Sequence, residues 1–170
     1  APLSEYDLIF TSNTTESINL VAEGISSNNG HDTAPVIMNT LLEHNSNDLP
    51  WRMVPGASMI RLSIDSQGFI DLKQLEACLC DYNSNKIHGV KRIKLVAISG
   101  ASNVLGVYND LEVISQIVHR YGALLLVDAA QMVAHRSISI KKTGIDFLAF
   151  SAHKVYAPFG TGVLIARKGL

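Results

Sequence analysis

The sequence is poor in cysteine, and this shortage excludes two kinds of structural support. Only two of the 170 residues are cysteine. Cys78 and Cys80 stand two positions apart in a stretch that we expect to be helical, where neighbouring side chains diverge. We therefore predict reduced thiols rather than a disulfide, and two thiols make no zinc site. Reduced cysteines are typical of a cytoplasmic protein.

Charged residues are also scarce, at 17% of the chain, and neither sign dominates. Lysine and arginine total 14 and the acidic residues total 15, so the net charge of -1 gives no reason to expect nucleic acid or an anionic membrane as a partner. No apolar run reaches the ~18 residues of a membrane span. The first five residues show no signal-peptide pattern. The 47% hydrophobic content indicates a buried sheet, together with surface that is covered by a partner or by further chain.

What is present is an alternation of strand-like and helix-like stretches within a length that suits one domain. Apolar runs predict strands at 8–11, 35–38, 58–62, 93–99, 123–127, 147–151 and 162–166. Helical spacing predicts helices at 14–23, 71–80 and 111–120. This order is typical of an α/β fold with three αβα layers and a mostly parallel central sheet. Ligands of such sheets bind at the C-terminal ends of the strands.

Polar residues stand at the ends of the predicted strands, and if the strands are parallel neighbours these residues converge on one edge. They are Thr14, Thr15, Asn103, Asp128, Ser151, His153 and Lys154. A helix that begins with two threonines offers free amides to an anion. The carboxylate of Asp128 can hold a protonated ring nitrogen, and the amine of Lys154 can form an imine with an aldehyde. A phosphate, a pyridine nitrogen and an aldehyde on one ring describe pyridoxal 5'-phosphate (PLP).

Each of these signals has an ordinary structural reading when it is taken alone. An aspartate after an apolar run is commonly a turn residue or helix cap, a Thr-Thr pair is commonly an N-cap, and a lysine at a strand end commonly points to solvent. Their combination in this order is what favours a PLP site.

Five segments resemble the class V aminotransferases, which are PLP enzymes of fold type I. They are 10–20, 43–51, 102–106, 127–131 and 151–154, and the likeness runs from about Phe10 to Arg167. The cysteine desulfurase and selenocysteine lyase branch is the most similar. The resemblance implies that the phosphate ligands are Thr14, Thr15, Ser151 and His153. It implies that His44 stacks on the pyridine ring, that Asp128 pairs with the ring nitrogen, and that Lys154 forms the Schiff base. Asn103 and Gln131 would lie near the phenolic oxygen or the substrate.

Some positions depart from the family pattern or allow a simpler reading. Asn13, Ala152 and Ala157 stand where the family has glycine, and we expect the turn at Asn13 to survive because asparagine tolerates positive φ. His44 alone would read as a surface or N-cap residue, and Trp51 as a core residue. Four further histidines match no motif and are expected at the surface: His31, His88, His119 and His135. Residues 160–162 predict a turn into the last strand.

The resemblance also implies parts that this chain does not contain. We expect residues 1–170 to be a single PLP-binding large domain, a fragment without an N-terminal segment and a small C-terminal domain. The arginine that grips the substrate carboxylate and the catalytic cysteine of desulfurases would lie there, since Cys78 and Cys80 are in the wrong region. The fragment alone is expected to be inactive. The family implies a homodimer, an amino acid as the small-molecule substrate and a sulfur-acceptor protein as a further partner.

Three functions remain open at this point. The first is a PLP-dependent lyase that transfers sulfur or selenium. The second is another class V activity, either transamination or racemisation. The third is a non-catalytic domain that retains the fold.

Overall fold

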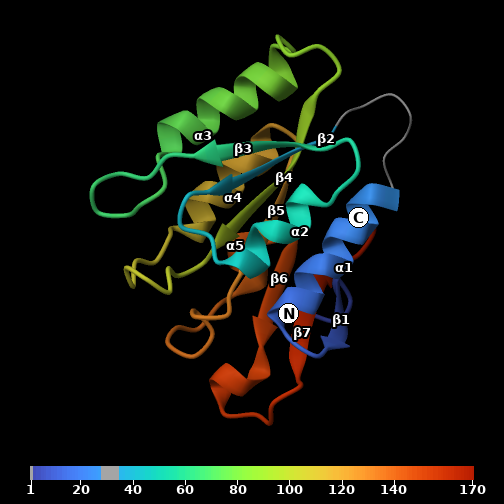
Figure 1. Ribbon diagram of the computed structural model, residues 1–170, viewed down its shortest axis with the longest axis vertical. Helices are drawn as coiled ribbons and strands as arrows, with labels where there is room; N and C mark the ends of the chain where they lie inside the picture. Colours follow the sequence, from blue (N-terminus) through green and yellow to red (C-terminus); the bar gives the residue numbers. More distant parts are fainter. Residues whose placement is uncertain (1, 28–34) are drawn as a thin grey trace.

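The computed structural model describes residues 2–27 and 35–170, so His31 lies outside the described residues. In this part of the chain, seven strands form one sheet in the order β1-β7-β6-β5-β4-β2-β3 (Figure 1). Their bounds are β1 Tyr6–Thr11, β2 Pro35–Thr40, β3 Ser58–Leu62, β4 Arg92–Ser99, β5 Leu124–Asp128, β6 Phe147–Ser151 and β7 Gly162–Arg167. Strands β2 to β6 run parallel to one another, whereas β7 is antiparallel to β6 and β1 is antiparallel to β7.

Helices cover both faces of the sheet, which confirms the predicted three-layer α/β architecture (Figure 1). One face carries α1 (Thr14–Ser27) and the short α2 (Leu49–Arg52), and the other carries α3 (Leu72–Leu79), α4 (Leu111–Arg120) and the short α5 (Ile140–Thr143). Three single turns complete the described elements: η1 Asn45–Asn47, the π-helical η2 Cys80–Ser84, and η3 Ala152–Val155.

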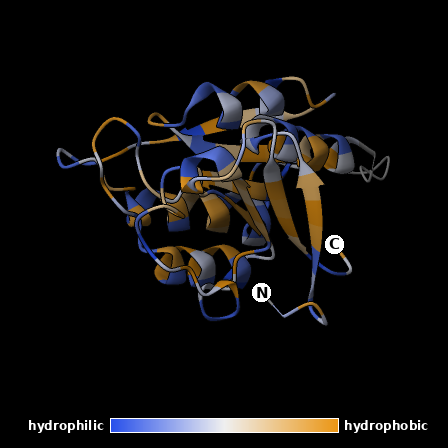
Figure 2. Cartoon of the chain, turned by 90° about the horizontal axis from the view of Figure 1, so that it is seen from below, coloured by the Kyte–Doolittle hydropathy of each residue, from blue (hydrophilic) through white to orange (hydrophobic). Residues whose placement is uncertain are grey.

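The central strands are buried on both sides, so consecutive side chains enter different cores. In β2, Val36 and Met38 pack with α3 and α4, whereas Ile37 between them packs with α1 and α2. Figure 2 shows the same division, with hydrophobic strands between helices that turn hydrophilic residues outward. This is why the parallel strands read as continuous apolar runs. Trp51 is fully buried and belongs to the core, as expected.

The first strand is placed differently from the prediction of a buried strand. β1 lies at the edge of the sheet, with β7 as its only partner among the described strands, and Phe10 is 79% exposed. A short apolar run predicts a strand, but the run alone does not distinguish a central strand from an edge strand. On the other side of the molecule, Asp71 caps α3, and the chain continues helically to Ser84, beyond the predicted end of this helix at residue 80.

A close backbone contact sets the position of the start of α1. A Cβ atom on Gly162 would lie 2.6 Å from the backbone nitrogen and Cα of Asn13. Glycine at this position therefore lets β7 approach the residue that precedes α1. Asn13 does not have the positive φ that we expected; instead its Oδ1 accepts a hydrogen bond from the Glu16 amide at 2.9 Å and caps the helix.

We expect Gly162→Ala to lower the free energy of unfolding by about 1–3 kcal/mol, because the added methyl meets backbone that cannot turn aside. Urea denaturation followed by circular dichroism measures this change. Gly24→Ala is the matched control, since a Cβ there meets nothing within 4 Å and alanine in a helix should add about 0.5–1 kcal/mol. Equal losses in the two variants would contradict the contact.

Candidate active site

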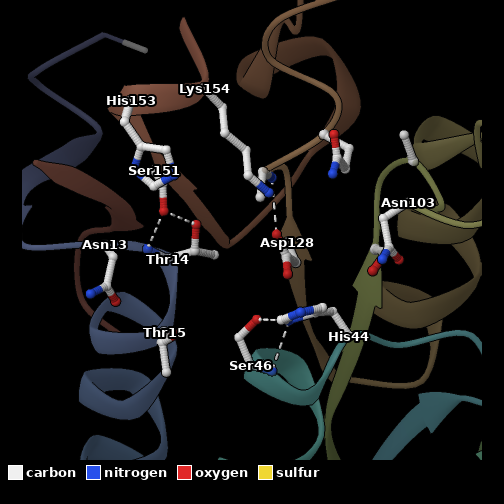
Figure 3. Close-up of a pocket in the computed structure, with 14 residues that line it drawn as sticks. Asn13, Thr14, Thr15, His44, Ser46, Asn103, Asp128, Ser151, His153 and Lys154 are labelled. Carbon is white, nitrogen blue, oxygen red and sulfur yellow. Dashed lines mark hydrogen bonds between the residues drawn. The ribbon is translucent and has the colours of Figure 1, made fainter. Parts of the chain in front are cut away.

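All nine residues predicted for the site line one cavity of about 260 Å³ (Figure 3). The cavity lies at the C-terminal ends of β4, β5 and β6, whose last residues Ser99, Asp128 and Ser151 all line it. The nine predicted residues are Thr14, Thr15, His44, Asn103, Asp128, Gln131, Ser151, His153 and Lys154. Parallel strands present these ends at the same edge, so residues up to 140 positions apart meet there.

One wall of the cavity is the start of α1, which is tied to the end of β6. The Thr14 amide donates to Ser151 Oγ at 2.8 Å, and the two hydroxyl groups are 2.7 Å apart. First-turn amides have no partner within their own helix. The Glu16 amide is bonded to Asn13, and Thr14, Thr15 and Ser151 all line the cavity. Together with His153, this wall suits an anion such as a phosphate.

Asp128 lies at the floor of the cavity and is only 5% exposed. Its Oδ1 accepts a hydrogen bond from the Ala130 amide at 2.9 Å. Burial raises the pKa of the Asp128 carboxyl above its usual range, and the Ala130 amide, Lys154 and His44 offset part of that rise. An ionised carboxylate here is costly unless a cation approaches, which suits a protonated ring nitrogen.

Lys154 lies on the opposite side of the same cavity from Asp128 (Figure 3). It stands in η3, directly after β6, and its side chain extends toward Asp128 (Figure 3). The two are not joined by an ion pair in the described structure, although the lysine charge acts on the Asp128 carboxyl. The amine and the carboxylate therefore lie beyond ion-pair distance of each other.

The loop that carries Lys154 accommodates the two alanines without strain at either one. Ala152 and Ala157 both lack positive φ, and they are joined by a hydrogen bond from the Ala157 amide to the Ala152 carbonyl at 3.1 Å. The left-handed conformation falls instead on Tyr156, at φ 68°, and on Gly160, at φ 82°. Gly160 provides the predicted turn toward β7.

His44 is the N-cap residue of η1, which was one of its two predicted roles, and it also lines the cavity where the other role, stacking on the ring, would take place. Its ring lines the cavity, and its Nδ1 accepts a hydrogen bond from the Ser46 amide at 3.2 Å, which caps η1. The Ser46 hydroxyl is also 2.5 Å from Nδ1. These contacts orient an otherwise exposed ring beside the cavity. Ser46 was not predicted for the site, although it lies within the 43–51 segment.

The remaining predicted residues and histidines take different places. Asn103 and Gln131 both line the cavity. His88 and His135 are exposed as expected. His119 is not a simple surface residue, because its Nε2 lies 2.7 Å from the buried Asp146 carboxylate. That contact joins α4 to the chain before β6, a distance in sequence that no local pattern reveals.

The residues present fit PLP in charge and in kind. A wall of hydroxyl groups at a helix start suits the phosphate. A buried acid without an ion-pair partner in the described chain suits the ring nitrogen, and an amine that lines the same cavity suits the aldehyde. The free cysteines, Cys78 and Cys80, are half-buried in α3 and η2, and neither is among the residues that line the cavity. None of the described helices has the length and apolarity needed to cross a membrane.

Comparison with known families agrees with this geometry. The model of the family described as aminotransferase class-V matches residues 3–170. The chain belongs to this family. A probable cysteine desulfurase of Halalkalibacterium halodurans is 38% identical over 168 residues, covering 97% of this chain and 39% of that protein. A probable cysteine desulfurase of Pyrococcus abyssi is 40% identical over 170 residues, with 97% and 39% covered.

Solved structures show the same fold. The apo cysteine desulfurase of Thermococcus onnurineus superposes with a TM-score of 0.82 at 36% identity, covering 95% of this chain and 38% of that one. The cysteine desulfurase CsdA of Escherichia coli gives a TM-score of 0.83 at 32% identity, with 94% and 38% covered. The class V aminotransferase chain described here thus spans about two-fifths of the length of the curated relatives it matches.

Proposed function

We propose that this chain is the cofactor-binding part of a PLP-dependent enzyme that removes sulfur or selenium from an amino acid, as a cysteine desulfurase does. The observation that carries the proposal is the meeting of Lys154, Asp128 and the start of α1 in one cavity. The relatives named cysteine desulfurase support the choice of reaction.

Each wall of the cavity has a part in this function. Thr14, Thr15, Ser151 and His153 bind the phosphate, and Asp128 holds the ring nitrogen in its protonated form. His44 lies against the ring face, Lys154 binds the carbonyl carbon covalently, and Asn103 and Gln131 border the substrate. When bound, PLP supplies an electron sink for the substrate's α-carbon. The amine of Lys154 would also act as acid or base and move a proton at that carbon.

We further propose that the working enzyme is a cytoplasmic homodimer that passes sulfur to an acceptor protein. Large apolar side chains stand uncovered around the cavity loops, with Tyr156 fully exposed, Phe159 at 88% and Met53 at 80%. Exposed apolar surface of this kind is typical of surface covered in an assembly. Light scattering of the full-length protein measures the oligomeric state, and a monomer at micromolar concentration would contradict the dimer.

The function is tested on the full-length protein supplied with PLP and L-cysteine. A desulfurase converts cysteine to alanine and transfers the sulfur to a thiol of the enzyme, from which a reductant releases sulfide in an amount equal to the alanine. Formation of a keto acid without sulfide would identify a transaminase. Formation of the D-amino acid would identify a racemase, and failure to bind PLP would identify a non-catalytic domain.

A further inference from the structure

Glu43 stands next to His44 in the chain, and its carboxyl group joins three elements at the edge of the cavity. Oε1 accepts a hydrogen bond from Thr40 Oγ1, at the end of β2, at 2.7 Å. Oε2 accepts hydrogen bonds from Asn47 Nδ2 in η1 and from Ser99 Oγ at the end of β4, both at 2.7 Å. Ser99 is 56 positions away in the sequence, so this contact forms only in the folded chain.

Glu43 is half-buried as a residue, its carboxyl group is enclosed by its hydrogen-bond donors, and no cation is among the groups that act on it. Burial raises its pKa above the usual range, and the hydrogen bonds from Ser99, Thr40 and Asn47 offset part of that rise. Two other buried acids do have cations, since Asp48 pairs with Arg61 and Asp146 with Arg167, whereas Glu43 shares the lack of an ion pair with Asp128 in the described chain. An acid held by hydroxyl and amide donors alone is costly for stability and therefore calls for another explanation.

The contacts of Glu43 lead to His44 on one side and to Asp128 on the other. The Asn47 amide donates to the His44 carbonyl at 2.7 Å, while the Asn47 side chain holds Glu43. Ser99 pairs with Asp128 in the β4–β5 register. The Glu43 carboxyl group thus connects the turn that carries His44 to β4, the strand that pairs with β5 at Asp128. The pyridine ring of PLP would lie between His44 and Asp128.

We propose that Glu43 is a positioning residue that holds the His44 ring at its place against the cofactor, through Asn47 and Ser99. This inference rests on the proposed function for the role of His44. It assigns Glu43 no contact with the cofactor and no proton transfer.

The first test measures the turn itself and needs no cofactor. In the full-length apo protein, Glu43→Ala should speed hydrogen exchange of the Ser46 and Asn47 amides about tenfold, since these amides bond to His44. The Ala129 amide, bonded to Ala149 at 2.8 Å, should not change. Glu112→Gln, at an exposed pair with Lys142, is the control and should alter neither. Unchanged exchange at Ser46 and Asn47 would overturn the proposal.

The second test is a double-mutant cycle on PLP affinity. Glu43→Ala should weaken binding about tenfold when His44 is present, and by less than about twofold in the His44→Ala background, because its effect passes through that ring. Glu43→Gln should restore most of the affinity, since its carbonyl can still accept from Asn47 and Ser99 while its amide faces the Thr40 hydroxyl. Independent effects of the two alanine substitutions would show that Glu43 only supports the fold, and would overturn the proposal.

Ser99→Ala serves if Glu43→Ala does not fold, because it removes one of the three donors and leaves the carboxyl group in place. It should change exchange at Asn47 and PLP affinity in the same directions, by a smaller factor, and no change in either would count against the proposal. A wild-type protein that binds no PLP would refute the proposed function, while the apo exchange result would still decide whether Glu43 holds the turn.

Discussion

Replacing Lys154 with alanine is expected to abolish the visible absorbance of lysine-bound PLP in the full-length protein. It is also expected to lower turnover by about 10²–10⁴-fold. The variant loses both the amine that binds the cofactor carbonyl and the group that moves the α-proton. Lys154 is exposed in η3 and forms no ion pair in the described structure, so the substitution should leave the fold intact. Absorbance spectra with added PLP and a steady-state assay with L-cysteine measure the two effects.

Lys91→Ala is the matched control, because Lys91 is also an exposed lysine but lies in the loop before β4, away from the cavity. It should retain both the absorbance and the turnover. Full absorbance in Lys154→Ala would show that another amine binds the cofactor, and equal losses in both variants would show that the effect is not local.

The positions of most site residues could be predicted from two local signals, whereas His44 and Gln131 were expected only from the resemblance to the family. Apolar runs mark the strands, and the residue that ends a run, such as Asp128 or Ser151, lies at the sheet edge once neighbouring strands are parallel. Parallel order itself follows from the alternation of strands and helices.

What could not be predicted depends on contacts between segments distant in sequence. The bond from Ser99 to Glu43 and the approach of Gly162 to Asn13 form only after the sheet is assembled. For the same reason, the edge position of β1 and the partnership of His119 with Asp146 have no local signature. Asn13 begins the helix by capping it rather than by adopting a positive φ, and the backbone at Gly162 of β7 lies close against it.

Asp128→Asn is expected to separate stability from function. The neutral amide cannot keep a ring nitrogen protonated, so PLP affinity should fall roughly 10–100-fold and turnover should fall with it. The apo protein, however, should be at least as stable as wild type near neutral pH. Burial raises the pKa of Asp128 in the folded state, so ionisation of this carboxyl group opposes folding. The side-chain oxygen of the asparagine can still accept the hydrogen bond from the Ala130 amide.

The sign of the pH dependence follows from that raised pKa. Relative to Asp128→Asn, the wild-type apo protein has its full stability below the ordinary carboxyl pKa of 3.8, and loses stability as the pH rises through the higher folded pKa. Urea denaturation of both apo proteins between about pH 4 and 8 measures this difference. A wild type that gains stability over the variant with rising pH would contradict the raised pKa of Asp128 in the folded apo protein.

Asp48→Asn should show the opposite behaviour and so serves as the matched control. Burial raises the pKa of Asp48, but the Asn39 hydrogen bond and the guanidinium groups of Arg52 and Arg61 outweigh it and hold the pKa below its usual value. Its stabilising contribution is therefore present above pH 3.8 and lost as the pH falls through the folded pKa. Asp48→Asn should cost about 1–3 kcal/mol at neutral pH. The pH dependence of stability would then have opposite signs for these two buried acids. Asp48 has arginine partners within the chain, whereas Asp128 has no ion-pair partner among the described residues and would take its cation from a ligand.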